Sequence, residues 1–503
     1  MGIPRGRPRD RFSQPLIYPS PDWHPMPAVN NPFRKLPSVN QLLESPQLKS
    51  LVDTANHNMV VSGVRTFMDR LREQISTATG EVSIPTPQEL AERIATWISR
   101  EDEASLRPVI NATGVILHTG LGRAPLADEA IGEMNALAAG YASVEVDLAS
   151  GKRSQRDQAV RRLLCELTGA ASATVVNNNA AATMLSLSAL GAGKEVIVSR
   201  GELVEIGGSY RLPDVMECSG ARLREVGTTN KTRLADYEAA INENTGALMR
   251  VHPSNYRVVG FTDSVSLPDL VNLGRRHNLP VIDDVGSGAL IDFAGFGLTD
   301  EPVVQESVAQ GASIVLFSGD KLVGGPQCGI IVGAGDLISR IKRHPMTRAM
   351  RVDKLTLAAL AATLRMYRDP EKARDSIPLL AMLSVPLENL KLRAERIATQ
   401  LANSPRLASA TAVEGTATLG GGSLPTQYLP TWCVALRPLK ASVDQLAGEL
   451  RTGWPAIFGR IQNDLLLLDL RTVHPRYDTQ IVEAINLPEA GAAGDLPQSA
   501  VQT

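Results

Sequence analysis

Between about residues 107 and 345, short runs rich in β-branched residues alternate with helical stretches. The runs are Ala173–Val176, Glu195–Val198, Ala247–Val251, Pro280–Ile282 and Ile314–Phe317. Near-continuous apolar strands separated by helices are typical of a parallel sheet that helices cover on both faces. The pattern therefore predicts an α/β core domain over 107–345 with a mostly parallel, doubly wound central sheet. Ligands of such sheets bind beyond the carboxyl ends of the strands.

The rest of the chain predicts two smaller domains and two tails. Residues 37–106 carry apolar residues at helical spacing, which indicates a small N-terminal helical domain. Residues 346–486 combine a long helix, Leu355–Tyr367, with later strands, which indicates a small α/β C-terminal domain. Residues 1–36 are basic and rich in Pro and Arg, and we expect them and residues 487–503 to be disordered. An electrostatic RNA contact is the alternative for residues 1–36.

Composition limits the partners and the compartment. Lys and Arg total 51 against 53 Asp and Glu, and aromatic residues make up 4%. This balance argues against a wholly basic nucleic-acid binder, and the few aromatics argue against a base-stacking sheet. The four cysteines form no CxxC pair, so neither a metal site nor a disulfide framework is expected. Without an apolar run of about 18 residues or a signal peptide, we expect a cytoplasmic protein with no membrane partner.

The segment Ser318-Gly319-Asp320-Lys321 directly follows the last of these runs, and further glycines come after it. A lysine in a glycine-rich turn suits a Schiff base, because the backbone can approach a flat cofactor and desolvation can lower the lysine pKa. The Ser318 hydroxyl can bind a phosphate. The alternative is a surface lysine in an ordinary turn.

Two further motifs follow strands of the same predicted sheet. Asp284 lies at the end of one strand, where a carboxylate can pair with a pyridinium nitrogen. A helix N-cap or a metal ligand is the alternative there. Asn178, Asn179 and Ala180 lie where a strand runs into a helix, so backbone N–H groups and the helix dipole suit a phosphate. An ordinary Asn cap is the alternative for that turn.

The order phosphate turn, carboxylate, lysine is more specific than any one of these motifs. It is the order that a fold-type-I enzyme dependent on pyridoxal 5′-phosphate (PLP) requires. The chain has no GxxxxGK[ST] loop and no GxGxxG after a strand, so no nucleotide-binding alternative competes. The sequence therefore predicts PLP as the cofactor, bound by Lys321, Asp284, Asn178, Asn179, Ala180 and Ser318.

A set of basic residues can hold an anion near this site. Arg123 ends the segment His118-Thr119-Gly120-Leu121-Gly122-Arg123. Arg348, Arg351 and Lys354 have the spacing i, i+3, i+6, which predicts that they share one face of one helix. Such cations can hold a phosphate or an acidic substrate, and a solvated basic face is the alternative.

With these residues in place, the chain resembles the bacterial L-seryl-tRNA(Sec) selenium transferase family, also called selenocysteine synthases, from about residue 36 to about 481. The most specific stretches are Asn177–Ala182, Ser199–Gly208, Glu225–Asn230, Gly260–Thr262 and Phe317–Gln327. Many members have Asn where this chain has Gly120.

The resemblance implies a fold-type-I PLP-dependent transferase that converts L-seryl-tRNA(Sec) to L-selenocysteinyl-tRNA(Sec). Selenophosphate would be the selenium donor, and the path would pass through a PLP-bound aminoacrylyl-tRNA. It implies the Schiff-base lysine at Lys321, the ring-nitrogen partner at Asp284, and active-site arginines at Arg123, Arg348 and Arg351. The N-terminal helical domain would bind the tRNA, and the subunits would form a homo-oligomer, commonly a decameric ring of dimers.

Two other readings compete with this one. A fold-type-I lyase acting on a small amino acid or amino sugar phosphate would keep Lys321 and Asp284 and need no tRNA. A non-catalytic tRNA-binding protein built on an inactive enzyme fold would not need those two residues. If the resemblance holds, the balanced total charge describes a near-neutral catalytic body with local basic surfaces.

Overall fold

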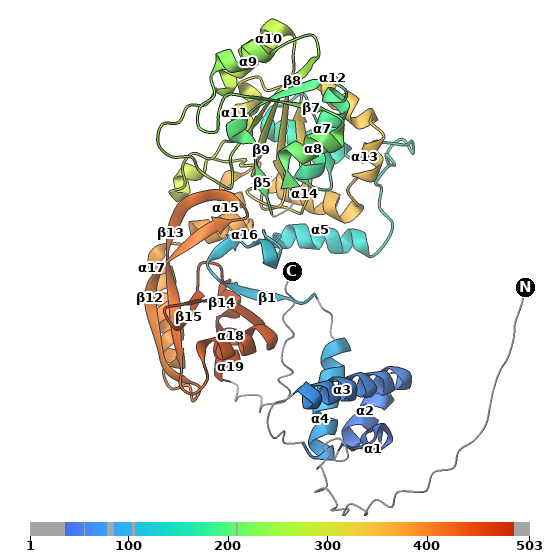
Figure 1. The fold of residues 1–503 in the computed structure, drawn as a ribbon, viewed down its shortest axis with the longest axis vertical. Helices are drawn as coiled ribbons and strands as arrows, with labels where there is room; N and C mark the ends of the chain where they lie inside the picture. The colour runs from blue at the N-terminus through green and yellow to red at the C-terminus, as the bar shows by residue number, and fades with distance from the viewer. Residues whose placement is uncertain (1–35, 55, 78–84, 103–105, 208–209, 487–503) are drawn as a thin grey trace, which may run out of the picture. The chain divides into compact units, whose positions relative to one another are not determined.

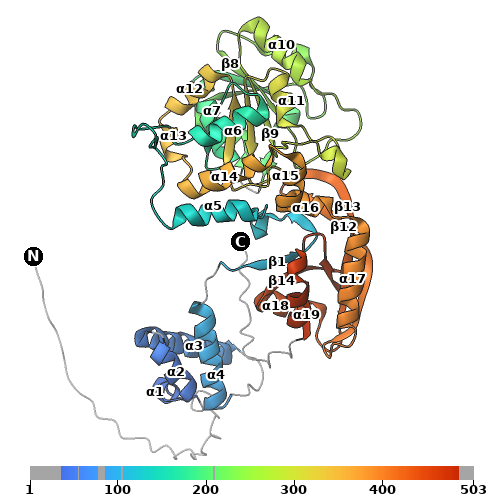
Figure 2. The same cartoon turned by 180° about the vertical axis from the view of Figure 1, so that it is seen from behind.

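The computed structural model describes residues 36–54, 56–77, 85–102, 106–207 and 210–486 (Figures 1 and 2). The chain divides into two compact units, residues 1–107 with 491–503, and residues 108–490. The tail predicted over 1–36 lies outside the described residues apart from Leu36. The tail predicted over 487–503 lies outside them entirely.

The first unit is helical, as predicted. Its helices are α1 (Val39–Leu43), α2 (Pro46–Thr54), α3 (His57–Thr77) and α4 (Pro87–Asp102). Ser38 caps α1 in a reciprocal arrangement with Gln41. The i, i+4, i+7, i+8 spacing of Val60, Val64, Phe67 and Met68 places these four residues on one face of α3, and all are buried. This unit therefore has a hydrophobic core of its own.

The second unit contains a seven-stranded sheet in the order β3-β11-β10-β9-β8-β4-β7. All of its strands run parallel except β11. Five of them confirm the predicted runs: β3 (Ser172–Val176), β4 (Glu195–Ser199), β8 (Thr245–Val251), β9 (Val281–Gly286) and β10 (Ile314–Ser318). Strands β7 (Arg222–Val226) and β11 (Gly329–Gly333) were not among the predicted runs.

Helices cover both faces of this sheet, as the doubly wound pattern requires. Strand side chains alternate between two hydrophobic clusters: Val315 lies in one, Ile314 and Leu316 in the other. The second cluster includes residues of α7 (Asn179–Gly191), α8 (Leu212–Ser219) and α12 (Gly335–Arg343). The first includes residues of α6 (Gln158–Thr168), α9 (Leu234–Ala240), α10 (Leu267–His277), α11 (Val304–Ala309) and α14 (Lys354–Met366).

A six-stranded sheet has the order β1-β14-β15-β13-β12-β2. Its strands are β1 (Val109–Ala112), β2 (Val115–Leu117), β12 (Leu407–Gly420), β13 (Ser423–Pro438), β14 (Ala456–Gln462) and β15 (Leu465–Asp469). α17 (Leu387–Leu401), α18 (Val443–Thr452) and α19 (Asp478–Asn486) pack against it. Strands β1 and β2 thus lie in the same sheet as the C-terminal strands, although the predicted core domain begins at residue 107.

The remaining elements connect these layers. They are α5 (Asp128–Ala138), α13 (Met346–Ala349), α15 (Pro370–Ser376), α16 (Pro378–Ser384) and the short strands β5 (Glu205–Ile206) and β6 (Tyr210–Arg211). The predicted helix Leu355–Tyr367 is present as α14. Within the described residues, no helix combines the length and the apolar character needed to cross a membrane.

Candidate functional site

A cavity of about 260 Å³ lies beyond the carboxyl ends of β8, β9 and β10. Parallel strands bring the residues that follow them to the same edge of a sheet, so motifs far apart in sequence meet there. Seven of the nine predicted site residues line the cavity: Arg123, Asn178, Asn179, Ala180, Asp284, Ser318 and Lys321.

Lys321 lies in the turn after β10 and is only 5% exposed. Burial lowers the pKa of its ammonium group, and the neighbouring Arg123 lowers it further, while nearby carboxylates oppose the shift. A lower pKa increases the fraction of neutral amine, which is the form that attacks a carbonyl carbon. The surroundings of Lys321 therefore suit a Schiff base.

Asp284 on β9 is 4% exposed, and both of its carboxylate oxygens accept hydrogen bonds from α7. Asn179 Nδ2 donates to Oδ1 at 2.9 Å, and Thr183 Oγ1 donates to Oδ2 at 2.9 Å. Burial raises the pKa of Asp284, whereas these two hydrogen bonds lower it. Both donors are neutral side chains, and a cationic ring N–H would compensate the buried charge.

The first turn of α7 faces the same cavity. Asn178 caps the helix through its Oδ1, which accepts from the Ala181 N–H at 2.8 Å. The N–H groups of Asn179 and Ala180 have no acceptor inside the helix, because the first turn of any α-helix leaves its donors free. They lie beside Ser318 at the cavity wall, where a phosphate would accept from them. Asn178 is therefore a cap, and the turn also suits a phosphate.

Taken together, these groups fit PLP. Among the described residues, the hydrogen-bond donors to the Asp284 carboxylate are all neutral, so the carboxylate matches the ring nitrogen, and the first turn of α7 matches the phosphate. Gly329 on β11 permits this arrangement, because a Cβ atom there would lie 2.1 Å from the main-chain oxygen of Asn178. Lys321 would hold the aldehyde carbon.

Arg123 lines the cavity but already has a partner. Its Nη1 lies 2.7 Å from Asp320 Oδ2, and Asp320 is nearly buried. Its φ of 63° is uncommon for a residue other than glycine. The turn thus places a guanidinium group beside Lys321, with part of its charge compensated.

Arg348 and Arg351 do not line the Lys321 cavity. Both line a separate cavity of about 660 Å³ together with Arg156, Lys342 and Arg343. Arg351 also lines a cavity of about 580 Å³ that shares Gln327 with the Lys321 cavity. Within one chain, the structure therefore does not bring these two arginines together with Arg123.

The prediction that Arg348, Arg351 and Lys354 share one helix face is wrong. Helix α13 ends at Ala349, and α14 begins only at Lys354. Asp353 caps α14 through hydrogen bonds from the N–H groups of Leu355 and Thr356, which separates the two helices. The Lys354 ammonium group donates to the main-chain oxygens of Leu137 and Gly140, at 2.7 Å each.

Several residues around the cavity were not predicted from the sequence. Thr183 lies one helical turn after Asn179, so the i, i+4 spacing could have flagged it. Tyr210 and Gln327 line the cavity without any local signal. His252, which follows β8, lines the cavity, whereas Asn255 does not. Asn255 Nδ2 donates instead to the main-chain oxygen of Glu205 at 2.8 Å.

Glu301 adds a second carboxyl group near Lys321. Ser287 Oγ donates to Glu301 Oε1, and Glu301 Oε2 is buried without a partner in the described residues. Burial raises the pKa of Glu301 to about 7. The surroundings of Lys321 therefore include a carboxyl group that is protonated in part at neutral pH.

Two family models match the chain. The one described as "L-seryl-tRNA selenium transferase" matches residues 109–474, and the one described as "Selenocysteine synthase N terminal" matches residues 33–72. The L-seryl-tRNA(Sec) selenium transferase of Moorella thermoacetica is 49% identical over 456 residues, or 90% of this chain and 96% of that protein. The protein of the same name from Carboxydothermus hydrogenoformans is 46% identical over 450 residues, or 89% and 95%.

Among solved structures, D-glucosaminate-6-phosphate ammonia-lyase matches with a TM-score of 0.53 and 22% identity. The match covers 76% of this chain and 95% of that one. Similarity at this identity concerns the fold alone. The predicted class, an α/β fold-type-I PLP-dependent transferase, is confirmed.

Proposed function

The chain belongs to the L-seryl-tRNA selenium transferase family, and we infer that it is a PLP-dependent enzyme that converts L-seryl-tRNA(Sec) to L-selenocysteinyl-tRNA(Sec). The observation that carries the chemistry is the cavity that joins a buried lysine to a buried carboxylate and the start of α7. The family match over residues 33–72 supports a tRNA substrate, because a lyase for free amino acids needs no such helical unit. The likeness to an amino sugar phosphate lyase extends only to the fold.

Each residue of the cavity has a distinct part in the proposed reaction. When bound, PLP supplies an electron sink for the pair of electrons released at Cα of the seryl group. Lys321 Nζ takes the Cα proton, since its lowered pKa keeps part of the amine neutral. Asp284 would hold the ring nitrogen, kept in place by Asn179 and Thr183. Asn178, Asn179, Ala180 and Ser318 would hold the phosphate.

Selenophosphate is the proposed selenium donor, with Arg123, Arg348 and Arg351 as its binding residues. Support for Arg123 comes from its position in the wall beside Lys321. Support for Arg348 and Arg351 comes from the basic cavity that both line. Arg351 also lines a cavity that shares Gln327 with the PLP cavity. Loss of the Cβ hydroxyl group as water, addition of the selenium of selenophosphate to Cβ, and hydrolysis of the P–Se bond with release of phosphate would complete the exchange.

We also propose that the first unit binds the tRNA and that subunits assemble as a ring of dimers, as in the family. A site that acts on a large RNA needs contacts outside a cavity of about 260 Å³. The helices α1 to α4 offer a separate surface for that purpose.

The direct test offers seryl-tRNA(Sec) or free serine to the PLP-loaded enzyme together with selenophosphate. Selenocysteinyl-tRNA(Sec) is expected from the charged tRNA, with far less product from free serine. Equal turnover of free serine would contradict the tRNA-dependent function.

Lys321→Ala is expected to abolish both turnover and the visible absorbance of the lysine-bound cofactor, because alanine has no side-chain amine to bind the PLP aldehyde or to take the proton. Lys372→Ala is the matched control, since Lys372 is an exposed lysine on α15 that faces Glu129 at 3.9 Å. An absorbance spectrum and a turnover assay check both variants. Turnover that survived in Lys321→Ala would disprove the assignment of Lys321.

A further inference from the structure

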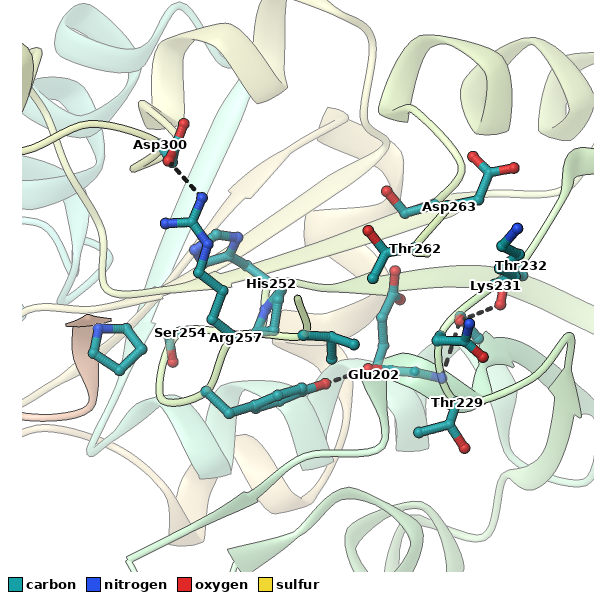
Figure 3. A pocket seen from close by; sticks show the side chains of 18 of the residues that line it. Glu202, Thr229, Lys231, Thr232, His252, Ser254, Arg257, Thr262, Asp263 and Asp300 are labelled. Atoms are coloured by element: carbon teal, nitrogen blue, oxygen red, sulfur yellow. Dashed lines mark hydrogen bonds and ion pairs between the residues drawn. The ribbon is translucent and has the colours of Figure 1, made fainter. Parts of the chain in front are cut away.

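A second cavity, of about 510 Å³, shares lining residues with the PLP cavity. Figure 3 shows side chains of its wall. Both cavities are lined by His252 and Ser254, which follow β8. The rest of the wall comes from loops after β4 and β7 and from residues 424–427 at the start of β13. Because β4, β7 and β8 are parallel neighbours, these loops gather at the same sheet edge as Lys321.

The wall between the cavities is connected to the cofactor site. The main-chain N–H of His252 donates to the main-chain oxygen of Asp284 at 2.9 Å, and the N–H of Ser254 donates to that of His252 at 2.7 Å. Burial and the nearby Arg250 lower the pKa of His252 to about 4, so the imidazole in this wall is neutral at physiological pH. A ligand in the second cavity would therefore lie next to the reacting centre, against a neutral wall.

Hydroxyl and amide groups dominate the lining, and its basic and acidic side chains are equal in number. The cations are Lys231, Arg250 and Arg257, and the acids are Glu202, Asp263 and Asp300. Arg257 faces Asp300 at 3.3 Å (Figure 3), and Arg250 faces Asp283 at 3.2 Å. A site for a free phosphate or selenophosphate would need an excess of positive charge. The balance favours an uncharged ligand with many hydrogen-bonding groups.

One side of the cavity, however, carries side chains that are available to a ligand. Lys231 makes no ion pair in the described part of the chain, and neither does Asp263. Main-chain hydrogen bonds hold their loops together: Thr232 N to Asp263 O at 3.0 Å, and Asp263 N to Asn230 O at 2.9 Å. Figure 3 shows Thr229, Lys231 and Asp263 on this side, opposite Arg257 and Asp300.

We propose that the second cavity binds the 3′-terminal nucleoside of the charged tRNA. The proposal rests on the proposed function, in which the reacting seryl group is esterified to the ribose of that nucleoside. The PLP cavity, about 260 Å³, is smaller than the roughly 300–1,000 Å³ of typical ligand sites. The proposed reaction places the cofactor and the seryl group there, which leaves the nucleoside to an adjoining space, and the second cavity shares His252 and Ser254 with the PLP cavity. Ribose hydroxyls and base edges are uncharged and rich in hydrogen-bonding groups, which matches the lining.

The test measures binding of 3′-(L-seryl)amido-adenosine, which cannot be hydrolysed as an ester can, to the PLP-loaded full chain. Calorimetry is expected to show tighter binding of this probe than of free serine. Lys231→Ala and Thr229→Val should each weaken binding of the probe by about fivefold, the usual loss for one hydrogen bond. Serine binding and the cofactor spectrum should stay unchanged. Lys194→Ala is the matched control, an exposed lysine just before the amino end of β4.

Two results would overturn the proposal: a wild-type enzyme that binds the probe no better than serine, or variants that bind the probe as wild type does. Lys231→Arg, which retains a cation, separates a local loss of contact from a folding defect and should bind within about twofold of wild type. Probe binding with no conversion of seryl-tRNA(Sec) would instead reject the proposed function and leave the nucleoside site intact.

Discussion

Asp284 depends on a residue that lies far from it in sequence. Thr183 is fully buried, and its hydroxyl donates to Asp284 Oδ2 at 2.9 Å. Burial raises the pKa of Asp284, and this hydrogen bond lowers it, so the contact favours the ionised carboxylate. The buried face of α7 thus packs against the sheet and also stabilises the carboxylate that would pair with the ring nitrogen of PLP.

Replacing Thr183 by Val should weaken PLP binding by about tenfold, because one carboxylate oxygen loses its donor in a buried site. Thr183→Ser retains the hydroxyl and should bind PLP nearly as wild type does. Titration of the apoenzyme with PLP, followed by absorbance, measures both affinities. Equal losses in the two variants would show that the hydroxyl is not the group that matters.

The buried Glu202 carboxyl group should make the stability of the fold depend on pH. Burial raises its pKa from 4.5 to about 7, so between these values the folded chain holds a proton that the unfolded chain has released. The stability that this proton contributes is present below about pH 4.5 and is lost as pH rises through 7. Glu202→Gln should remove that loss, worth at most about 3 kcal/mol between pH 5 and 8.

Urea denaturation of both proteins across that range measures this difference. Glu301, which titrates in the same window, is common to both, so its contribution cancels. Parallel curves of unfolding free energy against pH would contradict the assignment to Glu202.

At the residue scale, the sequence predicted Lys321 and Asp284 because each lies at the end of a recognisable strand. Thr183 was not predicted although it lies one helical turn after Asn179, because its partner Asp284 is on a strand distant in sequence. Gln327 was not predicted because it carries no local signal. Arg348 and Arg351 show a different limit: their spacing is helical, but Asp353 starts a new helix just after them.

At the element scale, strand β11 determines where α7 can begin. Gly329 pairs with Ser318 on one side and with Val176 on the other. Its missing side chain leaves room for the main chain of Asn178. The antiparallel β11 therefore controls the position of the turn that would hold the phosphate.

Gly329→Ala should destabilise the protein by about 1–3 kcal/mol and weaken PLP binding, since backbone atoms must move to admit the methyl group. Gly335→Ala is the matched control, because Gly335 begins α12 with open space around it. There the change should be neutral or stabilising by up to about 1 kcal/mol. Denaturation and equilibrium dialysis with PLP check both. Normal PLP affinity in Gly329→Ala would refute this role of β11.

Elements were predicted best where the hydrophobic signal was strong. The five buried strands stood out as apolar runs bounded by helices. Strand β7 reads Arg-Leu-Arg-Glu-Val, is largely exposed at the sheet edge and therefore lacks that signal. Strand β11 is apolar, but it comes soon after the glycines that follow Lys321. Its residues were therefore interpreted as part of the glycine-rich turn.

At the scale of the whole molecule, the two units have separate hydrophobic cores. In the part of the chain that the structure describes, the core of the first unit runs from Leu36 to Ile98, and none of its residues belongs to a cluster of the second unit. Each core can therefore be stable without the other.

A chain that begins at residue 107 should therefore still bind PLP, with the visible absorbance of the full protein. Its KM for seryl-tRNA(Sec) should rise by roughly tenfold or more, about 1.4 kcal/mol, if the first unit supplies tRNA contacts. Absorbance and a turnover assay test the two halves of this prediction. A shortened chain that turned over seryl-tRNA(Sec) with an unchanged KM would remove the proposed role of the first unit.

The pairing of β1 with β14 could not be predicted, because it joins Val109 to Ala456 and leaves no local signature. It also bears on the order in which the protein folds as it leaves the ribosome. The strands of the seven-stranded sheet all lie within residues 172–333. This sheet can therefore form before β12 and β14, the partners of β2 and β1, have been synthesised. The six-stranded sheet closes only when β14 and β15 emerge. Synthesis of β14 and β15 is therefore the step that completes the six-stranded sheet beside a seven-stranded sheet that has already formed.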